Sequence, residues 1–130
     1  MNLQFLLPRR LLLATCLFLA TQTLLFAQSA KVLVFSKTKG WHHSSIPFGI
    51  KAIQKLGQEN NFGVDTTTSS TLFTDQNLQN YQTIIFNNTT GDVLNNEQQA
   101  AFERYIQAGG GFVGIHSALI PNMLGLGTES

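Results

Sequence analysis

Residues 109–116 read GGGFVGIH, a glycine-led apolar stretch that ends on a histidine. A short apolar run that follows glycines is typical of a strand. In open α/β sheets, ligands bind in the crevice outside the carboxyl ends of the strands. The stretch therefore predicts an α/β fold in which His116 lies at the functional edge of a sheet.

The sequence before this stretch contains three more segments that are expected to form strands. Residues 31–36, KVLVFS, are a compact β-branched and aromatic run, the pattern of a buried parallel strand. Residues 62–68 and 82–87 are the second and third expected strands. Helical patterns separate these segments, so the strands are predicted to pair in parallel through right-handed crossovers.

Three helical segments are expected between the strands. Ser45 is predicted to be the N-cap of the first, with Pro47 in its first turn, and Gly57 and the polar residues 58–61 are predicted to end it. A short turn is expected at 74–81, and a capping box opens the last helix at Asn95. The apolar stripe of the first helix consists of Ile46, Ile50, Ile53 and Leu56. The order of elements predicts a three-layer α/β/α, flavodoxin-like parallel sheet of about four strands, the N-terminal part of such a fold.

The first thirty residues are expected to lie outside this domain. The basic pair Arg9-Arg10 precedes the apolar residues 11–26, and small residues follow at 27–30. This order is typical of a secretory signal peptide, with cleavage after Ala27 or Ala30. The alternative is a retained anchor, but the apolar segment is shorter than the roughly twenty residues that span a membrane. We therefore expect export to a bacterial periplasm or the extracellular space, with no stable membrane span after cleavage.

The composition of residues 31–130 excludes several classes of site. Six basic residues against seven acidic ones give a net charge of about −1, which favours neither nucleic acid nor an anionic membrane as a partner. The one cysteine, Cys16, precedes this part of the chain, which excludes disulfides, thiolate metal sites and a cysteine nucleophile there. Glycines 109–111 precede a strand instead of joining a strand to a helix, so no nucleotide motif is present.

Three loops are expected at the carboxyl edge of the sheet. The first, residues 40–45, contains His42, His43 and Ser45. Histidines accept, donate or ligate near neutral pH, and a helix N-terminus favours negative charge. A capping loop with solvated imidazoles is the alternative interpretation. We take His43 and His116 as candidate catalytic residues, and His42 and Ser45 as candidate substrate-binding residues.

The second loop, residues 87–92, is rich in amides and hydroxyls. Asn88, Thr89 and Thr90 suit the hydroxyl groups of a sugar, although the same residue types are ordinary turn formers. These three residues are candidates for substrate binding.

The third loop, residues 114–118, is similar to a nucleophile elbow, with His116 in the elbow position. Ser117 is a candidate substrate-binding residue. As a nucleophile it would need a base and an acid from later sequence, which disfavours a Ser/His/Asp hydrolase. A divalent metal on His43 and His116 would need a third ligand, which the sequence does not identify. The cofactor is therefore left open, with a divalent metal as one candidate.

With these residues in place, the chain resembles the trehalose-utilisation (ThuA-like) family of the class I glutamine amidotransferase-like superfamily. The resemblance runs from about residue 31 to 118. It rests on FSKT at 35–38, HSSIPFGI at 43–50, NTTGDVL at 88–94, QAAFERYI at 99–106 and the stretch at 109–116. It implies a flavodoxin-type fold, metabolism of trehalose or a related glycoside, and loss of the amidotransferase nucleophile. His43 and His116 are carried over as pocket residues. Trp41-His42 stands where the family has an aromatic residue and arginine.

The resemblance stops at residue 119. The family continues with D-T-E-Y-x-W-P-W-Y-G-K, whereas residues 119–130 read LIPNMLGLGTES. Suitable codons for these residues encode D-T-E-Y-A-W-P-W-Y-G-K when read in a shifted frame. We therefore expect residues 119–130 to be an out-of-frame tail, and residues 31–118 to be a partial domain that is inactive as written. A non-catalytic carbohydrate-binding domain is the alternative function.

The coding DNA checks the frameshift directly. We expect the codons from Leu119 onward to encode D-T-E-Y in the shifted frame. Codons that encode LIPNM but give another sequence in that frame would contradict it.

Overall fold

The computed structural model describes residues 29–118 of the chain. The predicted tail of residues 119–130, and the predicted signal peptide apart from residues 29–30, lie outside the described residues. The described elements, in chain order, are β1 (Lys31–Phe35), α2 (Ile46–Asn60), β2 (Gly63–Thr67), the 3-10 helix η2 (Ser70–Leu72), α3 (Asp75–Leu78), β3 (Thr83–Asn87), α4 (Asn96–Gln107) and β4 (Gly111–Ile115).

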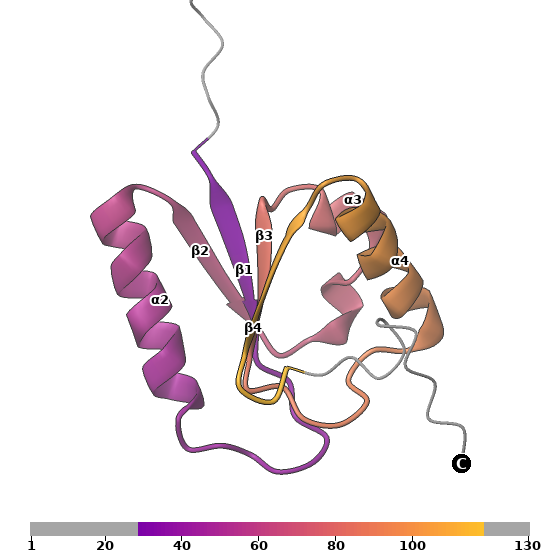
Figure 1. Cartoon of the computed structure of the whole chain (residues 1–130), viewed down its shortest axis with the longest axis horizontal. Coiled ribbons are helices and arrows are strands. Elements are labelled where there is room, and N and C mark those ends of the chain that lie inside the picture. The colour runs from indigo at the N-terminus through magenta and orange to yellow at the C-terminus, as the bar shows by residue number, and fades with distance from the viewer. Residues whose placement is uncertain (1–28, 119–130) are drawn as a thin grey trace, which may run out of the picture.

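The four strands form one parallel sheet in the order β2-β1-β3-β4. Helix α2 covers one face, and α3 and α4 cover the other (Figure 1). This arrangement confirms the predicted three-layer α/β/α architecture. The strand order reverses direction between β1 and β3, so the loops after these two strands flank the switch point where open α/β sheets bind ligands.

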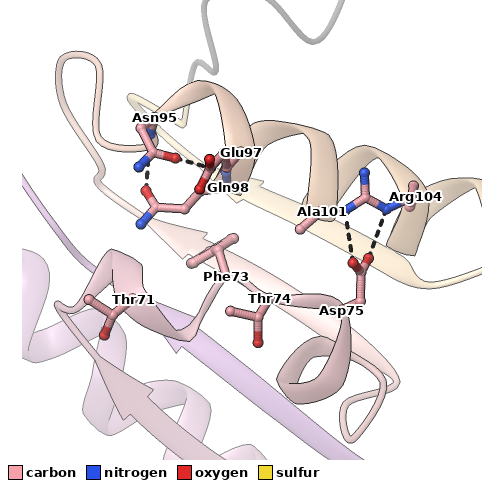
Figure 2. Close-up of a pocket in the computed structure, with 9 residues that line it drawn as sticks. All are labelled: Thr71, Phe73, Thr74, Asp75, Asn95, Glu97, Gln98, Ala101 and Arg104. Carbon is pink, nitrogen blue, oxygen red and sulfur yellow. Dashed lines mark hydrogen bonds and ion pairs between the residues drawn. The ribbon is translucent and has the colours of Figure 1, made fainter.

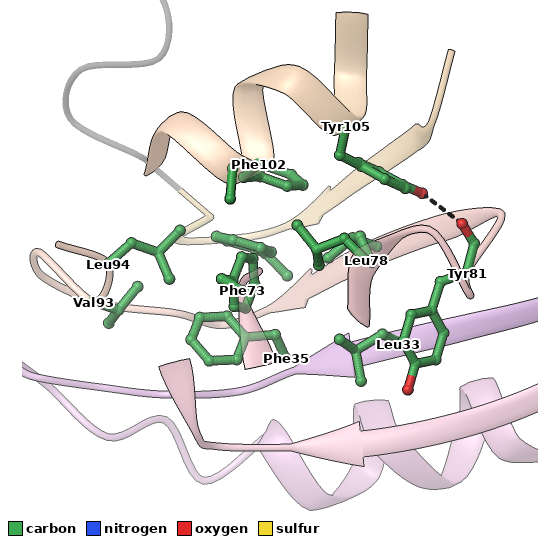
Figure 3. Close-up of a cluster of buried hydrophobic side chains, with 12 residues drawn as sticks. Leu33, Phe35, Phe73, Leu78, Tyr81, Val93, Leu94, Phe102 and Tyr105 are labelled. Atoms are coloured by element: carbon green, nitrogen blue, oxygen red, sulfur yellow. Dashed lines mark hydrogen bonds between the residues drawn. The ribbon is translucent and has the colours of Figure 1, made fainter. Parts of the chain in front are cut away.

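An aromatic cluster fills the space between the sheet and the helices α3 and α4 (Figure 3). Phe35, Phe73, Phe86 and Phe102 are all buried, with ring centroids 4.7–5.7 Å apart in edge-on and stacked pairs. Such pairs stabilise a core beyond the area they bury. The opposite face, under α2, is smaller and aliphatic, with Val34, Ile53 and Ile85 buried. Most of the apolar core therefore lies on the α3–α4 side.

Helix α2 ends where it was predicted to end and differs from its prediction in its buried stripe. The end was expected over Gly57 and residues 58–61, and the helix runs to Asn60 and closes on Asn61 in the left-handed conformation at φ 57°. A Cβ at Gly57 would lie 2.6 Å from Cγ2 of Val64, so the glycine is where α2 approaches β2 most closely. Leu56, expected on the buried stripe, is 51% exposed because this contact is made by Gly57 instead.

A polar cluster joins the edge strand β2 to the start of β1 and to the segment before β3, through Asp65, Lys31 and Tyr81. The Lys31 ammonium lies 2.7 Å from the Asp65 carboxylate, and the Tyr81 hydroxyl donates a hydrogen bond to the same oxygen at 2.8 Å. The bond from Lys31 holds the pKa of Asp65 below its usual range. Burial, and then the bond to Asp65, raise the pKa of Tyr81 to about 12. Tyr81 is therefore neutral at physiological pH and serves as a donor.

Edge strand β4 is the least covered strand of the sheet. Phe112 and Val113 are 41% and 45% exposed, whereas the middle residues of β1 and β3 are buried.

Among the described helices, none combines the length and the apolar character needed to cross a membrane.

Replacing Phe102 by alanine tests the role of the aromatic cluster. Phe102 is fully buried and contacts rings on β3, β4 and the η2 segment, so Phe102→Ala should lower the free energy of unfolding by about 3–5 kcal/mol. Urea unfolding followed by circular dichroism measures the change. Phe48→Ala is the matched control, because Phe48 is 71% exposed on α2. Equal losses in the two variants would contradict a core centred on Phe102.

Candidate functional site

Two of the predicted site residues meet at the carboxyl edge of the sheet. The rings of His43 and His116 lie edge to face, with centroids 4.6 Å apart at an interplanar angle of 79°. The Ser117 hydroxyl lies 3.3 Å from Nε2 of His43. These three residues, which we call the histidine–serine cluster, come from the loop after β1 and the turn after β4. The predicted proximity of His43 and His116 is therefore confirmed.

The turn after β4 is tight because His116 adopts a left-handed conformation. Its φ is 58°, a region that non-glycine residues rarely occupy. The turn is held by two bonds: the Ala118 N–H donates to the His116 carbonyl at 2.9 Å, and the Thr89 hydroxyl donates to the Ser117 carbonyl at 3.2 Å. Strained backbone of this kind is maintained at functional sites by the surrounding structure. Here it presents the side chains of two successive residues at the sheet edge.

Hydrogen bonds join the loop after β1 to the loop after β3. Thr38 and Thr90 form an isolated parallel bridge, and the Lys39 N–H donates to the Thr90 carbonyl at 2.8 Å. The Thr90 hydroxyl donates to the Trp41 carbonyl at 2.8 Å. These bonds fix the path of the loop that carries His43.

A buried hydrogen-bond network around the Asn87 side chain joins the ends of β1 and β3 to the start of α2, next to the site loops. The fully buried Asn87 side chain donates to the Ser36 hydroxyl at 3.2 Å and to the Ile46 carbonyl at 3.1 Å. It accepts a bond of 2.9 Å from the side chain of Asn88, which itself has a left-handed φ of 56°. Asn87 and Ser36 were not predicted as site residues. The sequence gives one indication of their role, because each is a polar residue at the end of an otherwise apolar strand segment.

Ser45 takes the predicted N-cap position of α2, directly before Ile46, but it does not cap the helix with its side chain. Its backbone is helical and its hydroxyl makes no capping bond. Its hydroxyl instead donates to the Asn88 side-chain oxygen at 3.4 Å, a long bond across to the β3 loop. The predicted Pro47 in the first turn of α2 is confirmed.

The remaining predicted residues surround the histidine–serine cluster in unequal ways. His42 is exposed, and its Nδ1 lies 3.5 Å from the Thr38 hydroxyl. Asn88 and Thr89 are buried, and Thr90 is half-buried with its hydroxyl bonded to Trp41 in the loop after β1. These side chains shape the loops. Direct contact of any of them with a substrate stays a prediction.

The structure changes the interpretation of Ser117. A base for this serine was expected only from sequence after it, but His43 supplies an imidazole from 74 residues earlier. Within residues 29–118, no carboxylate forms a hydrogen bond or ion pair with His43, so the contact is a pair and not a triad. The same range contains no group of three His, Cys, Asp or Glu side chains close enough to hold a metal. A metal on the two histidines would need a ligand from elsewhere.

A cavity of about 370 Å³ lies in a different place, between the η2–α3 segment and α4 (Figure 2). Four of its polar residues are paired with one another. Asn95 and Gln98 form the predicted capping box, and the Arg104 guanidinium makes two bonds of 2.9 and 2.8 Å to Asp75. None of the predicted site residues lines this cavity. The paired groups stabilise the helix ends and leave the carboxyl edge as the candidate site.

The fold and the site together define a flavodoxin-like α/β domain whose carboxyl edge carries a histidine pair, one from the loop after β1 and one from the turn after β4. The sequence profile of the ThuA family, described as trehalose utilisation, matches residues 31–125. The match therefore continues past residue 119, where the resemblance was expected to stop. The chain therefore belongs to the ThuA family.

The chain is similar to a ThuA-like protein from Bacteroides uniformis whose crystal structure is known. The two sequences are 28% identical, and the structures match with a TM-score of 0.57. The match covers 72% of this chain and 39% of that one, so the chain spans well under half of this relative. Among curated proteins, no significant match is found.

Replacing Gly49 by alanine tests the amide network. A Cβ at Gly49 would lie 2.5 Å from the Asn87 side-chain oxygen. In an open helix position this change gains about 0.5–1 kcal/mol, whereas forced displacement of Asn87 should cost about 1–3 kcal/mol. Thermal unfolding gives the sign, and NMR signals of the His43 and His116 rings should shift. Gly40→Ala is the control, since its nearest neighbour would be 3.6 Å away. A more stable Gly49→Ala variant would contradict the network.

Proposed function

We propose that this ThuA domain binds a small carbohydrate, trehalose or a related glycoside, at the carboxyl edge of its sheet. The histidine–serine cluster carries the proposal. It joins two imidazoles and a hydroxyl at the place where this fold class binds ligands. Membership of a family described as trehalose utilisation supports a sugar as the ligand.

The surroundings of the cluster suit a ligand rich in hydroxyl groups. His42 and Ser45 are exposed in the same loop as His43, and each presents groups that can donate or accept a hydrogen bond. Trp41, at 76% exposure, adds a broad apolar face beside these polar groups. Small-molecule sites combine apolar and aromatic surface with a few placed polar groups.

The chemistry proposed for the two histidines is general acid–base catalysis. Imidazole both gives and takes a proton near neutral pH, so one ring can take a proton from a sugar hydroxyl while the other donates one. Such positioned transfer contributes about 10²–10⁴-fold to a rate. His43 is the proposed base, because its Nε2 faces a hydroxyl in the present arrangement.

A non-catalytic carbohydrate-binding domain is the second candidate. It is favoured by one observation: within residues 29–118 no carboxylate orients either histidine, as the acid of a triad does. The sequence also predicts that residues 31–118 are an incomplete domain that is inactive as written, which agrees with a non-catalytic role. We also propose that the protein is exported, because the first thirty residues have the pattern of a secretory signal peptide.

Titration of the full chain with trehalose tests the function. We expect saturable binding by calorimetry, with His43→Ala and His116→Ala each weakening it about tenfold, the loss of roughly one hydrogen bond to a charged or polar group. Lys51→Ala, on the exposed side of α2, is the control and should bind as the wild type does.

Product analysis of the same mixtures separates the two candidates. New sugar species that depend on His43 support acid–base chemistry, and binding without turnover supports the binding domain. Failure of trehalose, related glycosides and their monosaccharides to bind would contradict both.

A further inference from the structure

The contact between Ser117 and His43 supports more than acid–base chemistry. We propose that Ser117 is a nucleophile activated by His43, and that the site cleaves an acyl ester carried by a carbohydrate. The sugar part of this inference rests on the proposed function, whereas the nucleophile rests on the geometry alone.

Position and reach favour Ser117 as the nucleophile. Its hydroxyl lies 3.3 Å from Nε2 of His43, within the somewhat loose range of nucleophile–base pairs without substrate. It follows the left-handed His116 directly, so it projects from a tight turn at the end of β4. The bond from Thr89 to its carbonyl fixes its main chain, and the side chain is only half-buried. The hydroxyl is therefore both held and accessible.

His43 is held as a base would need to be. The Ile46 N–H donates to its carbonyl at 3.2 Å, which ties its backbone to the start of α2. The His116 ring packs edge-on against its ring at 4.6 Å and restricts its rotation. Packing thus orients this imidazole, where a triad uses a carboxylate.

The other serines with buried hydroxyls are committed to structural bonds. The Ser70 hydroxyl lies 2.7 Å from the Lys37 amine, which is similar to a serine–lysine pair, but it donates its proton to the Val93 carbonyl at 2.6 Å. The Ser36 hydroxyl accepts a bond from Asn87. Within residues 29–118, Ser117 is the serine whose hydroxyl faces an imidazole.

The proposed reaction proceeds in two balanced steps. The Ser117 oxygen attacks the ester carbonyl carbon, its proton passes to Nε2 of His43, and the carbon–oxygen bond to the sugar breaks. The departing sugar oxygen takes that proton from His43. Water then attacks the acyl-serine, giving its proton to His43, and the carboxylic acid leaves as the Ser117 oxygen recovers a proton. Water is the sole co-reactant.

Labelling of the full chain with diisopropyl fluorophosphate tests the nucleophile without any sugar. We expect the label on the peptide that contains Ser117, read by mass spectrometry. His43→Ala should slow labelling about a hundredfold, in line with the loss of a general base. Ser44→Ala is the matched control, an exposed serine of the same loop that should leave the rate unchanged. Hydrolysis of p-nitrophenyl acetate should fall in parallel.

Two outcomes would overturn the proposal: no label on Ser117 of the wild-type chain, or an equal labelling rate in His43→Ala. Mapping the label on the wild type needs no folded variant, and circular dichroism checks that His43→Ala is folded. Sugar binding without labelling would remove the nucleophile and keep the proposed function. Labelling without sugar binding would do the reverse.

Discussion

The buried amide of Asn87 is the interaction on which the candidate site depends. It joins the end of β3 to the end of β1 through Ser36, and to the start of α2 through the Ile46 carbonyl. An amide in the protein interior is costly unless its groups are bonded, so the three elements must keep these positions for the network to be satisfied. The loops that leave β1 and β3 therefore start from fixed points. Gly49 is part of the same constraint, because a side chain there would occupy the space of the Asn87 oxygen.

The apolar core and the candidate site lie in different parts of this domain. The phenylalanine cluster between the sheet and α3–α4 supplies most of the buried apolar surface, and it lies along the body of the strands. The histidines lie at the strand ends, on a loop and a tight turn that contribute little to that core. They are held by hydrogen bonds of the loops, by backbone conformation and by the contact between their own rings. A rigid scaffold with functional groups on its loops is the usual arrangement in α/β proteins.

The sequence was a good guide to the elements and to the general place of the site. The β-branched and aromatic runs predicted all four strands, and the capping box at Asn95 marked the start of α4 correctly. Local chemistry misled the prediction where a distant contact competed with it. Gly57 lies within α2, where it allows the helix to approach β2, and the helix ends later in the predicted range. Ser45 takes the predicted N-cap position, but its hydroxyl bonds to Asn88 and not to the helix backbone. Such choices depend on partners far away in the chain, which a local pattern does not contain.

By itself, the sequence determined the alternation of strands and helices, and hence that His43 and His116 would lie at one edge of a parallel sheet. Hydrophobic periodicity contains that information, because each element must bury its apolar face. Only the tertiary structure decided that Ser117 faces His43 across 74 residues, and that Asn87 supports the loops around them. These contacts depend on the left-handed turns at Asn88 and His116, conformations that only the packing around them stabilises.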